Sequence, residues 1–551
     1  MHHSHFSRKK YLSLFLLFIA VSLTFSCKRN RKHKEPVHTD FSYDDFAEQL
    51  KTRIVPLDSL DKTNYRSIQH NVRFAYEHND HDPIWLSHGY KADDAAIKIL
   101  QELEDIKWDG LNPENYHISE LRKLQGKLGK KETTLAEAMA FDTALTNSYL
   151  QAASDLMFGR IAPKKADSLW FHANDSSWNA AGVLPNMQTK FASLSTFRSK
   201  VPTYNLLCNE YKHYSTLSTD ATLISAITAL RDSELTVDAK TECITTIINK
   251  EAPWITTALN DSVSEWTQLI TTYQNYTGIK PTGKLDSTTI ASLTTLPDSV
   301  LPKIGANLER VRWMQHDFGN LYVLVDIPLM QLFLRENGKN SMHMRVVVGK
   351  MERQTPSLYA RMANVVINPP WGVPPTILKK EVLPGIQKSG GAYLAKKGLK
   401  IYDNKGKPIN VATITAKNYK RYNYKQAPGD DNALGYVKFN LPNPWDIYLH
   451  DTPHRGDFVK RYRALSSGCI RLEFPQEMAL YILGQLEKKK IDQDKLDSII
   501  ETHKTQWNVL SNKIPVHITY LTAFEDTTGQ HINFINDVYH RDNKLIALMG
   551  K

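Results

Sequence analysis

The sequence predicts a multidomain α+β protein with a helical N-terminal region, a small three-helix module and a β-rich C-terminal domain that carries an insertion. The chain has 551 residues, which is more than one hydrophobic core usually organises. Apolar residues recur at helical spacing through residues 43–250, and they alternate as in a strand from Tyr322 to Leu334. We therefore expect two or three domains.

The N-terminus has the features of an export signal. Basic residues at 8–10 precede an apolar run over 11–25, which is shorter than the roughly 20 residues that span a bilayer. Residues 23–27 resemble a loose lipobox, in which Cys27 is diacylated and becomes the mature N-terminus. An uncleaved membrane anchor is the alternative. Either way, residues 1–27 place the body of the protein on the periplasmic side of the cell envelope, attached to a membrane.

A tether and a helical domain follow the signal. Residues 28–45 are basic and then polar, without an apolar period, which is typical of a linker. Over residues 46–255 the pattern is helical, and in one helix the apolar face consists of Ala96, Ile99, Leu103 and Ile106. The breakers Asp109, Gly110, Asn112 and Pro113 end that helix. Trp85, Leu111 and Tyr116 are expected in the core.

Residues 258–297 form a second helical module. Trp266, Leu269, Ile270 and Tyr273 predict an amphipathic helix, residues 278–283 predict a turn, and residues 288–293 begin another helix. This stretch is similar to a peptidoglycan-binding three-helix repeat, although Lys284 and Leu285 replace its usual acid-glycine step. Its aromatic residues are more often core than a sugar platform.

The C-terminal domain begins near Asn307. Apolar and polar residues alternate from Tyr322 to Leu334, which predicts a strand. Asn337 and Gly338 predict a type I′ hairpin turn, after which residues 344–348 form the returning strand. Prolines at 369, 374 and 375 make a rigid turn around Trp371, which fits the rim of a site or a corner of the core equally well. A Lys-, Gly-, Tyr- and Asn-rich insertion over 386–431 interrupts the strands. A helix follows Pro475 to about Leu486, and the final strand is residues 516–521.

The segment from Tyr448 to Pro475, YLHDTPHRGDFVKRYRALSSGCIRLEFP, sets one histidine and one cysteine in a turn-rich frame. Cys469 follows Gly468, which lets the backbone approach a ligand closely. His450 ends an alternating apolar run, so we expect a strand that delivers it to the mouth of a site. A free thiol ionises at about pH 8.5, and His450 and Arg471 are the available base and cation. The amides of Gly468 and Cys469 are a candidate oxyanion hole.

Other interpretations of this segment stay open. A lone cysteine is often a small buried hydrophobe, and a lone histidine is often structural. His450, Asp451, His454 and Cys469 are also metal-ligand types, but the chain has no CxxC and no second cysteine nearby.

The same segment resembles the catalytic motif of the L,D-transpeptidases with a YkuD-type domain, in which a histidine precedes a serine-x-glycine-cysteine-x-arginine turn. Four other stretches match this family in order: VVVGKMERQTP (346–356), NPPWGVPPTILKKEVLP (368–384), NALGYVKFNLPN (432–443) and VHITYLTAF (516–524). The resemblance is to the large YcbB-like branch, and it covers nearly the whole chain from about residue 40. Many smaller members carry histidine at the position of Ser467.

The resemblance implies a scaffold domain, a peptidoglycan-binding-like module and a β-rich catalytic domain over 307–547, with residues 386–431 as a capping subdomain. It implies that His450 accepts the proton of Cys469, whose thiolate attacks a tetrapeptide stem between its third and fourth residues. D-Alanine leaves, and a diaminopimelate amine of a neighbouring stem opens the thioester to give a 3→3 cross-link. No cofactor is expected, and carbapenems are expected to acylate the thiol.

The remaining residues of the motif have supporting roles under this resemblance. Arg471 holds a substrate carboxylate or braces the turn, and Tyr448 adds an oxyanion contact. Ser466 and Ser467 cap the turn. Asp451 orients the imidazole through its backbone carbonyl.

Three other functions stay open. The thioester is hydrolysed in an L,D-carboxypeptidase, or it is passed to a lysine of an outer-membrane protein that becomes attached to the wall. The third alternative is a non-catalytic wall-binding lipoprotein.

Charge and cysteine content agree with an exported envelope protein. The formal charge of +11 and the pI near 9.1 favour anionic surroundings, and peptidoglycan carboxylates fit that field. A solvated basic surface explains the charge as well, and no nucleic-acid-binding motif is present, so no nucleic-acid partner is expected. Cys208 and Cys243 are left over, and in an oxidising compartment we expect them as a candidate disulfide.

Overall fold

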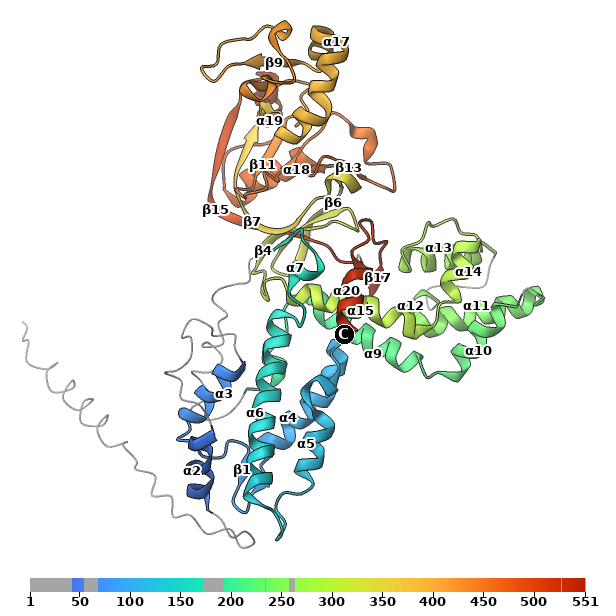
Figure 1. The fold of residues 1–551 in the computed structure, drawn as a ribbon. Coiled ribbons are helices and arrows are strands. Elements are labelled where there is room, and N and C mark those ends of the chain that lie inside the picture. The colour runs from blue at the N-terminus through green and yellow to red at the C-terminus, as the bar shows by residue number, and fades with distance from the viewer. Residues whose placement is uncertain are drawn as a thin grey trace, which may run out of the picture.

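A computed structural model describes residues 42–53, 68–172, 192–232, 234–256, 263–526 and 528–550. Helices fill one end of the molecule and a β-rich part fills the other, and the C-terminus returns between them (Figure 1). The predicted multidomain α+β architecture is confirmed. The signal segment, Cys27 and most of the predicted tether lie outside the described residues. Within these ranges, no helix combines the length and the apolar character needed to cross a membrane.

The first helical unit is built around one long helix, α6 (Leu135–Phe158). Thr134 and Glu137 form a reciprocal capping box at its start, which satisfies amide donors that the first turn leaves unpaired. The other elements are α2 (Tyr43–Arg53), α3 (Ile68–Glu77), β1 (Leu86–Ser87), β2 (Lys91–Ala92), α4 (Asp94–Asp105), η2 (Ile106–Asp109), η3 (Pro113–Tyr116) and α5 (Ile118–Gln125). Helix α2 begins inside the predicted tether, so the tether is shorter than expected.

Helix α4 follows the predicted pattern. Asp93 caps it by accepting a hydrogen bond from the Ala96 amide, and Gly110, at φ 69°, ends the following turn. Its apolar face is buried, and the expected core residues Trp85, Leu111 and Tyr116 are buried as well.

The second helical unit includes residues 258–297, where the described residues form two helices, α13 (Val263–Tyr276) and α14 (Ser287–Leu293). Its other elements are α9 (Pro202–Leu217), α10 (Ala221–Leu230), α11 (Val237–Glu251) and α12 (Pro253–Thr256). Gln274 is fully buried and organises the turn after α13, because its amide oxygen accepts from the Thr282 and Gly283 amides at 2.7 and 2.9 Å. Tyr273 is buried, so it belongs to the core of the module.

Two buried carboxyl groups lie where this module meets α9. Tyr276 donates to Glu210 at 2.9 Å, and Tyr273 donates to Glu251 at 3.2 Å. Burial raises the pKa of Glu210 to about 7 and that of Glu251 to about 8. Glu251 is therefore largely protonated near neutral pH, and Glu210 is about half protonated.

This pair predicts a stability that falls with rising pH. Because the pKa of Glu251 is higher in the folded than in the unfolded chain, its contribution is complete below about pH 4 and is lost through about pH 8. Between pH 5.5 and 8.5, we expect the Tm of Glu251→Gln to change by at least about 2 °C less than the Tm of the wild type. Calorimetry of Glu242→Gln, an exposed glutamate on the same helix, is the control. Equal slopes in the two variants would contradict this assignment.

Helix α15 (Pro297–Arg312) joins the helical units to the β-rich part and packs against α9 and α20 (Asp542–Met549). It spans the predicted domain start at Asn307, so the boundary falls within a continuous helix. Buried Arg312 pairs with Glu309 at 2.8 Å and donates to the Asp109 carbonyl at 2.8 Å. The connection between the two parts is therefore a packed polar interface.

The candidate disulfide between Cys208 and Cys243 is not formed, and both thiols are free. Cys208 donates instead to the Asp109 carboxylate at 3.6 Å, which also receives Arg198 and Tyr204. Spacing along the chain cannot reveal this buried acceptor, because the contact joins segments that are far apart in sequence.

The β-rich part is a closed sheet. Its strands are β3 (Trp170–Phe171), β4 (Leu321–Asp326), β5 (Gln331–Glu336), β6 (Lys339–Gly349), β7 (Ser357–Ile367), β11 (Val437–Asn440), β12 (Leu449–His450), β13 (Ala464–Ser466), β14 (Ile470–Leu472) and β15 (Gln506–Thr519). The order is β11-β12-β14-β6-β5-β4-β15-β7-β3, and β11 also pairs with β7. That last pairing closes the sheet and leaves few free edges.

Two features of the sheet differ from the sequence prediction. The run from Tyr322 to Leu334 is two antiparallel strands joined by a turn, and β4 is buried along almost its whole length instead of alternating. Both faces of β4 are covered, which removes the alternating pattern. Strand β3 lies in the predicted helical region and pairs in parallel with β7. The predicted hairpin is confirmed, because Asn337 and Gly338 have φ of 51° and 78°.

The insertion folds as a small unit with its own core, which we call the cap (residues 371–426). It contains β8 (Trp371–Gly372), α16 (Pro375–Ile377), η6 (Leu378–Val382), α17 (Leu383–Lys396), β9 (Leu399–Tyr402), η7 (Val411–Thr413), η8 (Tyr419–Arg421) and β10 (Asn423–Gln426). Its core includes Leu378, Val382 and Leu383, so the unit starts upstream of the predicted residue 386. In Figure 1 the cap lies at the end of the molecule opposite the first helical unit.

Nine short elements remain in the part of the chain that the structure describes, and one of them, η4 (Leu194–Phe197), packs on α6 in the first helical unit. The others are α7 (Pro163–Ala166), η5 (Met351–Arg353), η9 (Arg455–Asp457), α18 (Pro475–Leu480), η10 (Tyr481–Leu486), α19 (Gln493–Glu501), β16 (Ala523–Glu525) and β17 (Ile532–Phe534). The helix predicted from Pro475 to Leu486 is present as α18 and η10.

Candidate active site

Three neighbouring strands bring the motif residues together. His450 on β12 lies beside Arg471 on β14 in a parallel pair, and beside Lys438 on β11 in an antiparallel pair. Side chains alternate along a strand, so Tyr448 shares the face of His450, and Cys469 shares the face of Arg471. The sheet register therefore places these five side chains on one surface.

The turn that carries Cys469 is held by hydrogen bonds on both sides. Ser466 donates to the Cys469 carbonyl at 2.6 Å and accepts from the Gly468 amide at 3.1 Å. Thr355 is fully buried and donates to the Gly468 carbonyl at 2.8 Å. Gly468 has φ 121°, which a side chain rarely allows. Ser466 thus caps the turn.

The predicted oxyanion hole changes as a consequence. The Gly468 amide is taken up by the Ser466 hydroxyl, so it cannot also be directed at a substrate. The Cys469 amide has no acceptor among the described residues, and the Tyr448 hydroxyl points at the sulfur. The Cys469 amide and the Tyr448 hydroxyl are thus the donors that lie beside the sulfur.

Cys469 is half-buried, and its thiol donates to the Asp446 carbonyl at 3.5 Å. Burial raises the pKa of this thiol above its usual value, while hydrogen bonds from the Tyr448 amide and hydroxyl and the charge of Lys438 act in the opposite direction. The thiol is therefore protonated in the free protein at neutral pH, and a base is needed to form the thiolate.

Tyr448 connects the thiol to the cap. Burial and the neighbouring Cys469 hold the pKa of its phenol well above the ordinary value, and the Trp371 indole also bonds to it. Lys438 lies over the Tyr448 ring, 4.0 Å from its centroid. Of the two positions that fit Trp371 from the sequence, the structure therefore places it at the rim of the site.

His450 is buried and is arranged as a base. Its Nδ1 lies 2.5 Å from the Asp451 carbonyl, which only accepts, so Nδ1 carries the proton and Nε2 keeps its lone pair. Burial lowers the pKa of His450 to about 3, and the charge of Arg471 contributes to this lowering. The imidazole is therefore neutral at physiological pH. The Asp451 carboxylate itself pairs with Arg455 at 3.0 Å.

Arg471 braces the site. It pairs with Asp457 at 3.2 Å, and burial lowers the pKa of its guanidinium. Because its charge also acts on both Cys469 and His450, it contributes to the local field, while its ion pair connects β14 to the loop after β12.

Ser467 is exposed and does not cap the turn. Its hydroxyl accepts from Arg353 at 2.7 Å, and the same guanidinium pairs with Glu381 of the cap. Arg353, Thr355 and Lys438 were not predicted as site residues. All three lie in stretches that resemble the L,D-transpeptidase family, and that resemblance is the feature of the sequence that could have identified them.

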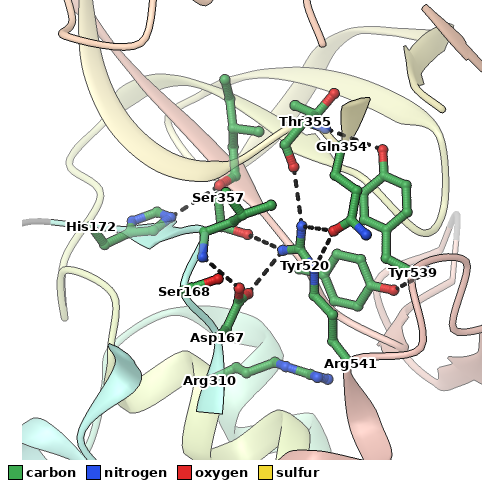
Figure 2. Close-up of polar contacts among 12 residues, drawn as sticks. Asp167, Ser168, His172, Arg310, Gln354, Thr355, Ser357, Tyr520, Tyr539 and Arg541 are labelled. Atoms are coloured by element: carbon green, nitrogen blue, oxygen red, sulfur yellow. Dashed lines mark hydrogen bonds and ion pairs between the residues drawn. The ribbon is translucent and has the colours of Figure 1, made fainter. Parts of the chain in front are cut away.

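A polar network supports the turn from below. Figure 2 shows the Arg541 guanidinium between Asp167, at 2.8 Å, and Gln354, at 2.8 Å. Arg541 also donates to the Thr355 carbonyl at 3.3 Å. Asp167 belongs to the N-terminal half of the chain, so the helical region and the C-terminus both position the segment that holds Gly468.

The metal interpretation gains no support from geometry. Within the ranges that the structure describes, no three His, Cys, Asp or Glu side chains converge in a way that would hold an ion. His454 is exposed in the loop after β12.

Comparison with known families agrees with this geometry. The model of the L,D-transpeptidase catalytic domain, YkuD, matches residues 320–492, which include both His450 and Cys469. Residues 320–492 are therefore similar to an L,D-transpeptidase catalytic domain. A second model, the Scaffold domain, matches residues 70–210. The first match covers the β-rich part from β4 to η10 together with the cap, and the second runs from α3 through the first half of α9.

A curated relative extends the match. The chain is 33% identical over 303 residues to a protein of Haemophilus influenzae named putative L,D-transpeptidase, covering 52% of this chain and 59% of that protein. The chain thus spans less than two thirds of that relative.

Solved structures show a weaker likeness. An Ldtfm–avibactam carbamoyl enzyme has a TM-score of 0.18 at 11% identity, covering 37% of this chain and 51% of that one. A point mutant of the Enterococcus faecium L,D-transpeptidase has a TM-score of 0.17 at 11% identity, with 37% and 52% covered. Mycobacterium tuberculosis L,D-transpeptidase 1 has a TM-score of 0.16 at 13% identity, with 36% and 61% covered. Likeness at this level carries no argument about the site.

Proposed function

We propose that this chain is a peptidoglycan transpeptidase that forms 3→3 cross-links by acyl transfer through Cys469. The observation that carries the proposal is the single surface shared by Cys469, His450 and Tyr448 within a match to the L,D-transpeptidase domain. The donor is a tetrapeptide stem, and the acceptor is a diaminopimelate amine of a neighbouring stem.

The first half-reaction forms a thioester. Nε2 of His450 takes the proton of Cys469, and the sulfur attacks the carbonyl of the third residue of the stem. The Cys469 amide and the Tyr448 hydroxyl stabilise the oxyanion. The tetrahedral intermediate collapses, the C–N bond breaks, and D-alanine leaves with the proton that His450 had taken.

The second half-reaction is the same chemistry in reverse. The acceptor amine attacks the thioester, and His450 removes its proton. The C–S bond then breaks, the new amide forms, and the thiolate regains the proton from His450. The cap limits access of water, which would otherwise hydrolyse the thioester.

We further propose that the protein works on the periplasmic side of the cell envelope and is attached to a membrane through Cys27 or an uncleaved signal. Carbapenems are expected to acylate Cys469, because a strained amide is an acyl donor for the same thiolate.

The products distinguish this function from its alternatives. We expect the full-length protein in detergent, incubated with a tetrapeptide stem, to release D-alanine and form stem dimers in equal amounts. Chromatography with mass detection measures both. Formation of tripeptide without dimer would identify a carboxypeptidase. Absence of both D-alanine and dimer would favour a wall-binding protein. Neither result is compatible with the proposal.

A further inference from the structure

The cap holds almost all of the net charge of the protein. Residues 371–426 contain eleven lysines and one arginine against only Glu381 and Asp403, which gives a net formal charge of +10, while the whole chain carries +11. A charge concentrated on so small a unit creates a strong local potential for anions.

The cap also contains a pocket with a volume of about 690 Å³. Basic and aromatic side chains line it together: Lys379, Lys380, Lys420 and Lys425 with Tyr419, Tyr422 and Tyr424. The four lysines are exposed, and within the described ranges none of them forms an ion pair. Their charges are therefore available to a ligand.

One wall of the pocket contains a buried polar atom without a partner. Tyr424 is 2% exposed, and its hydroxyl has no hydrogen-bond partner among the described residues. A buried hydroxyl left unpaired destabilises the folded protein. This atom indicates a ligand that completes its hydrogen bond.

The pocket is joined to the active site by short links. Gly372 and Val373 line the pocket directly after Trp371, and Trp371 bonds to Tyr448 beside the thiol. Glu381, one residue from Lys380, pairs with Arg353, which also holds Ser467 next to the active-site turn. A ligand in the pocket therefore lies beside the site while leaving Cys469 free for the donor.

We propose that this pocket binds the carboxylates of the acceptor stem peptide, an inference that rests on the proposed function. A stem peptide is a short chain with several carboxylates. Lysine ammonium groups are compact positive charges that attract such carboxylates. The tyrosine rings cover its apolar parts, and the Tyr424 hydroxyl bonds to a carboxylate. The pocket thus selects an anionic peptide and presents its amine to the thioester.

Kinetics with separate donor and acceptor test this assignment. A tripeptide stem accepts but cannot donate, so the concentration dependence of dimer formation gives an acceptor KM. We expect the double variant Lys379→Gln/Lys380→Gln to raise that KM at least tenfold, with the rate of acylation by the donor within twofold of wild type. Lys405→Gln/Lys407→Gln removes the same charge from the exposed cap surface outside the pocket, and its KM is expected to change less than twofold.

A third variant separates binding from folding. Tyr424→Phe removes only the unpaired hydroxyl, so we expect a weaker acceptor KM together with an unchanged or higher Tm. Equal KM values in all variants would overturn the proposal, and so would equal losses in both double lysine variants, which would indicate diffuse attraction.

Calorimetric binding of the tripeptide to the full-length protein keeps the test independent of turnover. If the wild type shows no acylation, the proposed function fails, and calorimetry alone then decides whether the pocket binds an anionic peptide. Binding at least tenfold weaker in Lys379→Gln/Lys380→Gln than in the Lys405→Gln/Lys407→Gln control supports an anionic-peptide site. Equal binding in the two overturns it.

Discussion

Replacing Cys469 by alanine is expected to lower the rate of D-alanine release by about 10³-fold or more, because among the described residues no other thiol lies on the shared surface. The turn should stay intact, since Ser466 and Thr355 bond to backbone groups of Gly468 and Cys469 and not to the sulfur. Release is measured by a coupled amino-acid assay with the tetrapeptide stem.

Cys243→Ala is the matched control for this variant. Cys243 is a free, half-buried thiol in the helical region, so its loss should leave the rate within about twofold of wild type. Full activity in Cys469→Ala, or equal losses in both variants, would remove the nucleophile assignment.

Replacing His450 by glutamine is expected to lower the acylation rate by about 10²–10⁴-fold, the usual range for loss of a general base. Glutamine keeps a polar group near the Asp451 carbonyl but has no lone pair that takes a proton at neutral pH. The exposed His454 offers a matched control, and His454→Gln should acylate at the wild-type rate.

The pH profile gives a second test of the same assignment. The pKa of His450 is lowered to about 3 and that of Cys469 is raised. The base therefore stays neutral and the thiol stays protonated from pH 5 to 8. Because both groups keep the protonation state that the general-base step requires, we expect the wild-type acylation rate to stay level over this range, without an inflection near 6.5. A bell-shaped profile centred below pH 7 would contradict the neutral-base arrangement.

Period-two alternation and turn chemistry predict where His450 and Cys469 lie, and the family resemblance is what indicates their chemistry. His450 ends a short strand and Cys469 directly precedes one, so the local pattern of apolar and turn residues predicts that both lie at the mouth of a sheet. The contact between the His450 imidazole and the Asp451 carbonyl is as predicted, because the two residues are adjacent in the sequence and therefore close in space.

Features that depend on distant segments cannot be predicted in the same way. The use of the Gly468 amide by Ser466, the bond from Thr355 and the link from Arg353 to Glu381 all require the folded sheet. Strand β3 is only two residues long, which is too short to show a period. The closed sheet buries both faces of β4, and that burial removes the alternation on which strand prediction relies.

The acyl-enzyme itself tests the central claim most directly. After incubation of the full-length protein with a tetrapeptide stem, intact-protein mass spectrometry followed by peptide mapping should show the tripeptide acyl group on Cys469. The adduct should disappear when acceptor is added, and dimers should form at the same rate. A protein that makes dimers without any adduct, or that carries the adduct on a residue other than Cys469, would contradict the account.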